Sequence, residues 1–369
     1  MTDPLGRRFR LALAFALSAV VLALYLPFLG VPFEYDDKVE ILTNQILRSP
    51  SDVGEMVRYN PFRVLLLYTF AWDLWAWGFR PSGYRALNIA IHVANTLLLL
   101  GILDAVAARL KLLRPRWFVA AGAATFAVHP LAIESVTYIS GRSSSLATFF
   151  VLLSTALYLR HLLLRDTKAV DDWLAAAGRR RNVALTAILG AGLLAGLPAA
   201  LAVRSGGVSP TRGLGLALGG TVALLGLLAA VGLERWRALP LGDPAGAGDG
   251  RRAARLHLLA FAAFVAGTLT KEIAATLPGI LLVLEVVIWR RADRPGRGVL
   301  RGRLFPFFAI PAFLIALRFA AYGYVASPAF IRPWTTNLLT QAEVVAHYCR
   351  LFVLPWPQSI YHDHAEVLP

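Results

Sequence analysis

Two adjacent carboxylates, Asp36 and Asp37, are the first residues of the chain that could do chemistry. They stand in the stretch FEYDDK at residues 33–38, directly after an apolar run over residues 11–31. Charged side chains beyond the end of an apolar run are often only solvated. A carboxylate pair can also bind a hard cation such as Mg²⁺ or Mn²⁺. Because the pair has no clear third oxygen ligand, a divalent metal is possible but not favoured, and we expect no obligatory cofactor.

A second group of reactive side chains falls in the stretch AVHPLAIESVTYISGRSSS at residues 127–145. Pro130 ends the preceding apolar run, and His129 stands directly before it at the end of that run. Glu134 follows in the loop, and Arg142 precedes the next apolar run. A turn with capping polar groups is the plainest interpretation, and a site is the alternative.

A third group is the pair Lys271–Glu272, which interrupts a long apolar region. Thr270 could cap the helix that follows, so a charged turn would explain the pair. Lys271 is nevertheless one of only four lysines among 37 basic residues. An ammonium group is a compact point charge, and its use in an arginine-rich chain hints at a chemical role.

The composition indicates a membrane protein. Hydrophobic residues make up 57% of the 369 residues and charged residues only 16%, more apolar surface than one soluble core could bury. The net charge of +15 comes largely from arginines in short loops between apolar runs. Membrane topology explains these arginines better than a nucleic-acid partner does. The one cysteine, Cys349, excludes an intrachain disulfide and a cysteine-built metal site.

Nine apolar runs approach the length needed to cross about 30 Å of hydrocarbon. We therefore predict an all-α integral membrane protein, a single domain over residues 1–369, with an uncleaved first helix rather than a signal peptide. A tight turn is expected at Lys271–Glu272, because a charged pair in mid-membrane would be costly. The nine predicted spans are 11–31, 84–106, 117–131, 145–164, 183–203, 214–233, 256–270, 273–290 and 304–324.

Two further apolar segments are not counted as spans. Residues 64–79 are short and combine Asp73 with three tryptophans, which suits a helix lying along the membrane surface. They belong to the predicted first non-cytoplasmic loop, 32–83. Residues 337–355 mix polar and apolar side chains and predict a half-buried helix within a non-cytoplasmic segment, 325–369.

The positive-inside rule orients these spans. With the N-terminus in the cytoplasm, the arginine-rich loops 107–116, 160–182, 234–255 and 291–303 all become cytoplasmic. The unusual polar residues then fall on the opposite side of the membrane. Solvation alone explains one such residue more easily than it explains a whole group on one side. The group consists of Glu34, Asp36, Asp37, Arg63, His129, Glu134, Arg142, Lys271 and Glu272.

The second predicted span carries a polar stripe. Asn88, His92 and Asn95 follow one another at spacings that place them on one helix face. Hydrogen bonding between helices is the commoner explanation for such a stripe, and a ligand site is the alternative.

The order of these motifs resembles one family. An acidic pair follows the first span, an arginine begins a loop helix, and Asn-x-x-x-His lies in span two. His-Pro-x-x-x-Glu and Ser-x-Arg-Ser follow span three, and Lys-Glu precedes span eight. From about residue 31 to its end the chain is similar to the transmembrane and tetratricopeptide-repeat O-mannosyltransferases and their bacterial relatives, within the GT-C class of membrane glycosyltransferases.

The resemblance implies an inverting transfer of mannose or another hexose from a polyprenyl-phosphate donor. The acceptor would be a protein Ser/Thr hydroxyl or a glycan outside the cytoplasm, and the membrane would be the bacterial inner membrane. By position, Asp36 matches the family's catalytic base and Asp37 its acidic neighbour. Donor phosphate or sugar binding is implied for the other matching positions, which are Arg63, His129, Glu134, Arg142, Lys271 and Glu272.

The chain departs from the family pattern in two places. The loop helix begins with Pro61-Phe62-Arg63 where the family has Arg-Pro. The family also continues into further spans and repeats, so the sequence reads as a short relative or as a fragment. A transporter or flippase of a lipid-linked or polar substrate is the alternative function; it would be expected to gather ionisable groups near mid-membrane.

Overall fold

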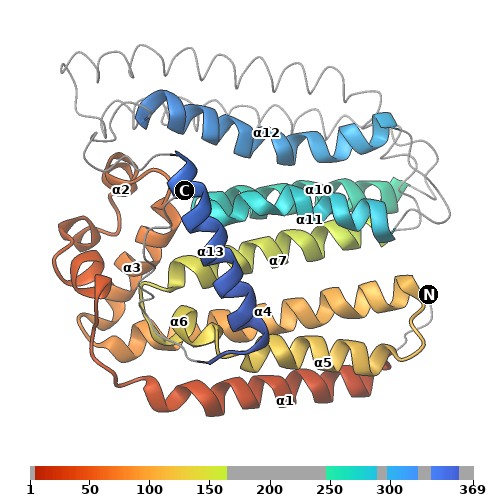
Figure 1. Ribbon diagram of the computed structural model, residues 1–369, viewed down its shortest axis with the longest axis horizontal. Helices are drawn as coiled ribbons and strands as arrows, with labels where there is room; N and C mark the ends of the chain where they lie inside the picture. The colour runs from red at the N-terminus through yellow and green to blue at the C-terminus, as the bar shows by residue number, and fades with distance from the viewer. Residues whose placement is uncertain (1–4, 164–246, 289–296, 323–333, 357–369) are drawn as a thin grey trace.

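The computed structural model describes residues 5–163, 247–288, 297–322 and 334–356, and in these ranges the chain is helical without strands. The long helices lie side by side, and short helices gather at one end of the bundle (Figure 1). The α-helices are α1 (Arg7–Tyr25), α2 (Val53–Tyr59), α3 (Val64–Trp77), α4 (Pro81–Leu110), α5 (Pro115–Val128), α6 (Ala132–Thr137), α7 (Arg142–Leu163), α10 (Ala247–Thr268), α11 (Leu277–Val283), α12 (Arg297–Tyr322) and α13 (Trp334–Val353).

Three described helices are long and apolar enough to cross a membrane, by length and composition. They are α1, which a 3-10 turn extends to Phe28, together with α4 and α7, and they correspond to the predicted spans 11–31, 84–106 and 145–164. The predicted span 117–131 coincides with α5, which has only 14 residues. The predicted spans 183–203 and 214–233 lie outside the described residues, so nine spans remain a prediction.

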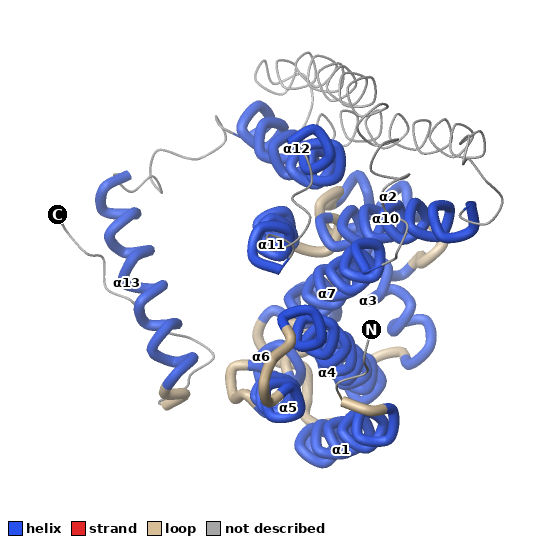
Figure 2. The backbone as a smooth tube through the Cα atoms, turned by 90° about the vertical axis from the view of Figure 1, so that its right-hand side faces the viewer, coloured by secondary structure: helices blue, strands red, loops and turns tan. Residues whose placement is uncertain are grey.

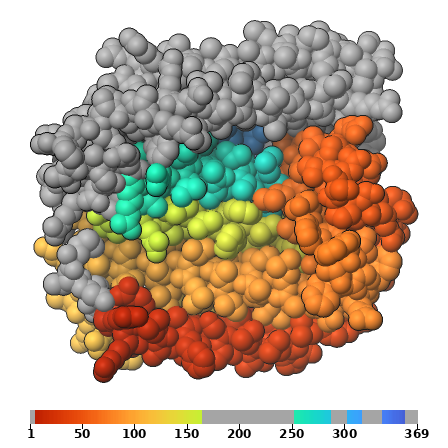
Figure 3. All heavy atoms as spheres, turned by 180° about the vertical axis from the view of Figure 1, so that it is seen from behind, coloured from red at the N-terminus to blue at the C-terminus, as the bar shows by residue number. Residues whose placement is uncertain are grey.

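The bundle is built in layers along the chain. Apolar side chains of α1, α4 and α5 form one core cluster, and those of α7, α10, α11 and α12 form another. A third cluster joins α3 to the loop before it and to Tyr84 and Ile139. Viewed from behind, α2 and α3 form a cap over one end of the bundle (Figure 3).

The region 256–290 bends where the charged pair predicts a turn. After α10, the amides of Thr270 and Lys271 both donate to the Gly267 carbonyl, at 3.0 and 3.1 Å. The chain then continues as a 3-10 helix (Glu272–Thr276), α11 and a π-helix (Leu284–Ile288). The tight turn at Lys271–Glu272 is confirmed, whereas the described part of the predicted span 273–290, up to Ile288, consists of three short helical pieces rather than one regular helix.

Helix α3 has two unlike faces. Leu66, Leu67 and Phe70 are buried, whereas Trp72 and Trp75 are 48% and 69% exposed. Exposed tryptophans beside a buried apolar face fit the expected interfacial helix. Helix α13 lies at the periphery of the bundle (Figure 2) and is mostly exposed, with Thr336, Thr340 and Leu351 buried. The half-buried position expected for residues 337–355 stays a prediction.

Buried polar groups tie α7, α12 and the π-helix together. The Tyr158 hydroxyl donates to the Glu285 Oε1 atom at 2.8 Å, and Arg303 Nη1 lies 3.0 Å from the same oxygen. Both charged side chains are at most 4% exposed. A buried ion pair mainly fixes one arrangement of its helices, because its attraction is offset by lost hydration.

Glu285→Ala is expected to destabilise the bundle by about 3–5 kcal/mol, because it removes the carboxylate opposite a buried guanidinium. Thermal unfolding of the detergent-solubilised protein, followed by circular dichroism, measures the loss. Glu343→Ala, which removes an exposed carboxylate from α13, is the matched control. Equal melting temperatures for the two variants would contradict the assigned role of Glu285.

Candidate active site

Arg85 folds the first loop back onto the bundle. This buried side chain of α4 donates to the carbonyls of Val31, Pro32 and Thr137, with the latter two at 2.8 Å. Its guanidinium therefore joins the end of the first apolar segment to the end of α6. The acidic pair follows four residues after Pro32, so this clamp brings it beside residues 138–142.

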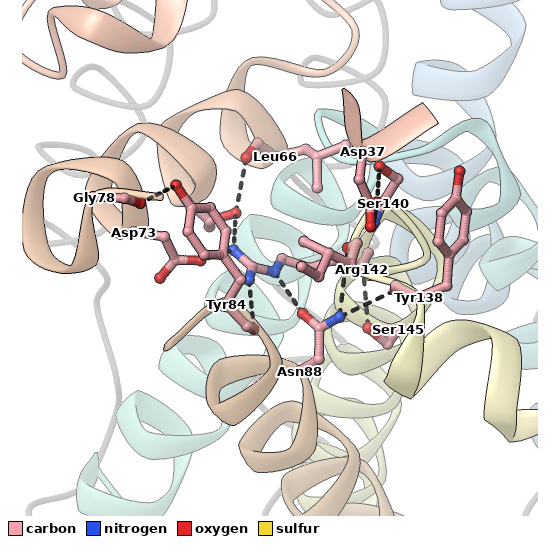
Figure 4. Close-up of polar contacts among 12 residues, drawn as sticks. Asp37, Leu66, Asp73, Gly78, Tyr84, Asn88, Tyr138, Ser140, Arg142 and Ser145 are labelled. Carbon is pink, nitrogen blue, oxygen red and sulfur yellow. Dashed lines mark hydrogen bonds and ion pairs between the residues drawn. The ribbon is translucent and has the colours of Figure 1, made fainter. Parts of the chain in front are cut away.

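Asp37 is fully buried and its carboxylate is occupied by the protein. Its Oδ1 atom accepts from the Ser140 amide at 2.8 Å and from the Ser140 hydroxyl at 2.7 Å (Figure 4). Its Oδ2 atom accepts from the Glu34 amide at 3.4 Å. A carboxylate held in this way organises a loop, and it is poorly placed to meet a substrate.

Asp36, in contrast, is exposed. Its backbone amide donates to the Tyr138 hydroxyl oxygen at 2.9 Å. The residue before it, Tyr35, has a φ of 45°, which a side-chain-bearing residue adopts only where the surroundings hold it. The structure thus separates the two acidic residues into one buried carboxylate and one that faces outward.

Tyr138 stays protonated beside the acidic pair. Burial is the largest cause that raises the pKa of its phenol to about 12; the hydrogen bond from the Asp36 amide acts in the opposite direction, and the charges of Asp36 and Asp37 add smaller increases. The oxygen of a neutral phenol can accept the hydrogen bond from the Asp36 amide, and the phenol can still donate a hydrogen bond through its own proton.

Arg142 points into the protein. Its guanidinium is 0% exposed and lies 2.5 Å from the Asp73 carboxylate. It also lies over the Phe70 ring, 4.7 Å from the centroid. Its other hydrogen bonds reach the Asn88 Oδ1 atom at 2.7 Å, the Tyr84 carbonyl at 2.8 Å and the Thr69 hydroxyl at 3.3 Å. Arg142 therefore joins α3, α4 and α7 in this structure and does not face an external ligand.

Gly141 allows this turn to close. A side chain there would overlap the carbonyl oxygen of Glu134 and would come within 2.9 Å of the Tyr138 carbonyl oxygen. Because backbone atoms cannot move aside as a flexible side chain can, only glycine fits between α6 and α7 at this point.

The polar stripe of α4 makes hydrogen bonds between chain segments, as expected. Asn88 Nδ2 donates to the carbonyls of residues 136, 138 and 139, at 3.3–3.4 Å. Asn95 Nδ2 donates to the Ser145 carbonyl at 2.9 Å, and His92 Nε2 lies 3.1 Å from the Ala127 carbonyl. The stripe supports the loop that carries Tyr138 and Ser140.

Lys271 adds a positive charge at the start of α7, directly after that loop. Its Nζ atom donates to the Ser144 hydroxyl at 2.8 Å, and the Leu65 amide donates to the Leu269 carbonyl at 3.2 Å, which brings the start of α3 alongside. Burial, and then the positive charge of Arg63, lower the pKa of Lys271, whereas the charges of Glu272 and Glu134 act in the opposite direction. Three other predicted site residues, Arg63, Glu134 and Glu272, thus act on the charge of Lys271.

His129 lies apart from the acidic pair. Its Nδ1 atom accepts from the Leu131 amide at 3.2 Å, so its Nε2 atom carries the proton that it donates to the Phe352 carbonyl at 2.9 Å. Its ring also stacks on Phe352 at 5.2 Å. This geometry makes His129 a contact between the end of α5 and α13, and the donor phosphate or sugar binding implied for it stays a prediction.

Four residues that the sequence motifs did not indicate make long-range contacts that hold this end of the bundle together. Asp73, Arg85, Tyr138 and Ser140 each make a long-range hydrogen bond or ion pair at this end of the bundle. A lone carboxylate in an apolar segment was the available signal for Asp73. Tyr138 and Ser140 carry no such signal, because their partners are backbone and side-chain atoms far away in the sequence.

Within the described ranges, no three His, Cys, Asp or Glu side chains are grouped closely enough to hold a metal ion. Within the acidic pair, both carboxylate oxygens of Asp37 already accept hydrogen bonds, from Ser140 and from the Glu34 amide. The absence of an obligatory metal remains a prediction.

Comparison with known proteins agrees with the motif order. The chain is 31% identical to protein O-mannosyl-transferase Tmtc1 of Drosophila melanogaster over 162 residues, 40% of this chain and 18% of that protein. It is 32% identical to Tmtc2 of Drosophila melanogaster over 171 residues, and 32% identical to human TMTC2 over 166 residues. Over this part, the chain resembles protein O-mannosyl-transferases.

The similarity is confined to part of each relative. It covers 18–19% of the length of these three proteins and 40–42% of this chain. No family model matches the sequence, and no solved structure matches it.

Proposed function

We propose that this protein is a membrane glycosyltransferase that moves mannose or another hexose from a polyprenyl-phosphate donor to a hydroxyl group outside the cytoplasm. A protein Ser/Thr side chain is the proposed acceptor. The observation that carries the proposal is that an exposed carboxylate residue, Asp36, and a partly buried ammonium, Lys271, both contact segment 138–144, Asp36 at Tyr138 and Lys271 at Ser144. The similarity to protein O-mannosyl-transferases supports the same chemistry.

The proposed reaction is a single displacement with inversion. The acceptor oxygen forms a bond to the anomeric carbon while the bond from that carbon to the phosphate oxygen breaks. Asp36 takes the hydroxyl proton as the oxygen attacks. The bonding electrons leave with the lipid phosphate, which gains a negative charge, and no acid is required because phosphate is already a good leaving group.

Lys271 is the proposed stabiliser of that new charge. A cation in a site with little water lowers the energy of a developing anion more than it would in bulk solvent. Arg63 contributes positive charge at the same place, since it lowers the pKa of Lys271. The polyprenyl tail would lie in the membrane, which explains why the polar loops sit at the end of an apolar bundle (Figure 1).

Lys271→Met is expected to weaken donor use about tenfold to hundredfold in kcat/KM, because a hydrogen bond from a charged donor contributes about 1.5–3 kcal/mol. The pKa of Lys271 is lowered, so its charge is lost at a lower pH than for an ordinary lysine, and the wild-type rate should fall on the alkaline side. Lys271→Arg keeps the charge and should move that fall to higher pH. The rate measured against pH checks both effects.

Lys38→Met is the control for Lys271→Met, because it removes an exposed lysine from the first loop. Equal rates for wild type and Lys271→Met at every pH would contradict the role proposed for Lys271.

The experiment that tests the function uses membranes containing the full chain. They are incubated with isotope-labelled polyprenyl-phosphate mannose, or with the corresponding glucose donor, and with protein and peptide acceptors. Mass spectrometry then identifies labelled product, and membranes without the protein give the background. Absence of product above background with every donor would contradict the proposed function. We propose the bacterial inner membrane as the location, with the site on its non-cytoplasmic side.

A further inference from the structure

We propose that Tyr138 is a positioning residue of the proposed reaction, which fixes Asp36 through a hydrogen bond to its backbone amide. The inference rests on the proposed function, since Asp36 is the proposed base. It concerns a residue that neither the motif order nor the similarity to known proteins singles out.

The first part of the evidence is the contact itself. The Tyr138 hydroxyl oxygen lies 2.9 Å from the Asp36 nitrogen, although 102 residues separate the two in sequence. The Tyr138 ring also meets the ring of Tyr35 edge to face, with centroids 6.4 Å apart. One side chain therefore contacts both the outward-facing acidic residue and the residue before it.

The second part is the backbone at Tyr35. Its φ of 45° lies in the left-handed region, which is unfavourable for a residue with a side chain. Such a conformation persists only where neighbouring contacts hold it. The bond from Asp36 to Tyr138 comes directly after Tyr35, and the bond from Asp37 to Ser140 comes next along the chain. These two hydrogen bonds hold Asp36 and Asp37, the two residues that follow Tyr35.

The third part is how Tyr138 is itself held. Asn88 donates to its carbonyl oxygen at 3.3 Å and to that of Ile139 at 3.4 Å. Asn88 in turn accepts from Arg142 at 2.7 Å. Segment 138–140 is therefore anchored to α4 and α7. It contacts the acidic pair twice, through the Tyr138 phenol at Asp36 and through Ser140 at Asp37, and Figure 4 shows the second contact.

The consequence for the reaction is geometric. Asp36 is exposed and lies in a loop, so its carboxylate would sample many positions without an anchor. A base acts only within hydrogen-bond reach of the proton that it takes, and a displacement of about 1 Å can cost about a hundredfold in rate. Tyr138 thus sets where the proton acceptor stands, without touching substrate itself.

Tyr138→Phe tests this role, because it removes the hydroxyl and keeps the ring. Hydrogen–deuterium exchange read by mass spectrometry should show faster exchange in the peptide that contains Asp36, because its amide loses an acceptor. In the transfer assay, kcat should fall about tenfold to hundredfold, while KM for the donor changes less than about twofold, as expected when only transition-state positioning is lost. The melting temperature should stay near that of wild type.

Tyr59→Phe, which removes an exposed hydroxyl from α2, is the matched control and should change neither exchange nor kcat. Exchange at Asp36 that is equal in Tyr138→Phe and wild type would overturn the inference. So would faster exchange with an unchanged kcat. A wild-type protein without transfer activity would instead overturn the proposed function, and the exchange measurement would distinguish that failure from a failure of the hydrogen bond.

Discussion

Asp36→Asn is expected to lower the rate of sugar transfer by about 10²–10⁴-fold, because an amide cannot accept the proton of the attacking hydroxyl. The substitution keeps the size of the side chain and leaves the backbone amide that donates to Tyr138. Protein amount and membrane insertion should therefore match wild type. Mass spectrometry of labelled product, normalised to the protein present in the membrane, measures the loss.

Two neighbouring carboxylates serve as controls for that result. Glu34→Gln removes an exposed carboxylate from the same loop and should leave the rate nearly unchanged. Asp37→Asn disturbs the contacts with Ser140, so its effect should include a lower melting temperature. Wild-type rates in Asp36→Asn would contradict the assignment of the base. A lost rate in Asp37→Asn alone, at unchanged stability, would move the assignment to Asp37.

Asp73→Ala is expected to destabilise the protein by about 3–5 kcal/mol, because it leaves a buried guanidinium without its carboxylate. Arg142 is 0% exposed and its Nη1 atom lies 2.5 Å from Asp73. The loss should appear as a lower melting temperature in detergent. Transfer should fall as well, since Arg142 also holds Asn88, which supports the loop beside the acidic pair.

The double variant Asp73→Ala with Arg142→Met separates charge from packing. Removing both charges together should recover part of the stability, because no unpaired charge is then buried. Glu55→Ala, at an exposed position of α2, controls for the loss of a carboxylate as such. A melting temperature of Asp73→Ala that equals that of Glu55→Ala would contradict the importance of the ion pair.

Local signals in the sequence predicted several features correctly. The spacing of Asn88, His92 and Asn95 predicted one helix face with interhelical hydrogen bonds, because helical geometry fixes which residues share a face. Lys271 and Glu272 predicted a turn, because charges are costly in an apolar segment. Residues 64–79 do contain a helix with exposed tryptophans, α3, and its place at the membrane surface stays a prediction. Each of these inferences needed only residues within a few helical turns.

The direction of the polar side chains could not be predicted in this way. Arg142 stands at the start of α7, where it could have faced solvent, a phosphate or the protein interior. Its partner Asp73 comes from another helix, and several carboxylates were available as candidates. His129 shows the same limit, since its contact with Phe352 joins residues 223 positions apart. Only the packed arrangement of the helices decides between such partners.

The hydrogen bond between Lys271 and Ser144 also constrains when the proposed site can exist. The two residues are 127 positions apart, and ribosomes add roughly 5–20 residues each second. Ser144 would therefore wait roughly 6–25 s before the lysine is synthesised, and the acidic pair would wait longer. During that interval the buried side chains of Arg85, Asp73 and Arg142 already have their partners within residues 31–145. These buried charged groups can thus be inserted with their partners already present, and the proposed site becomes complete only when the segment that carries Lys271 arrives.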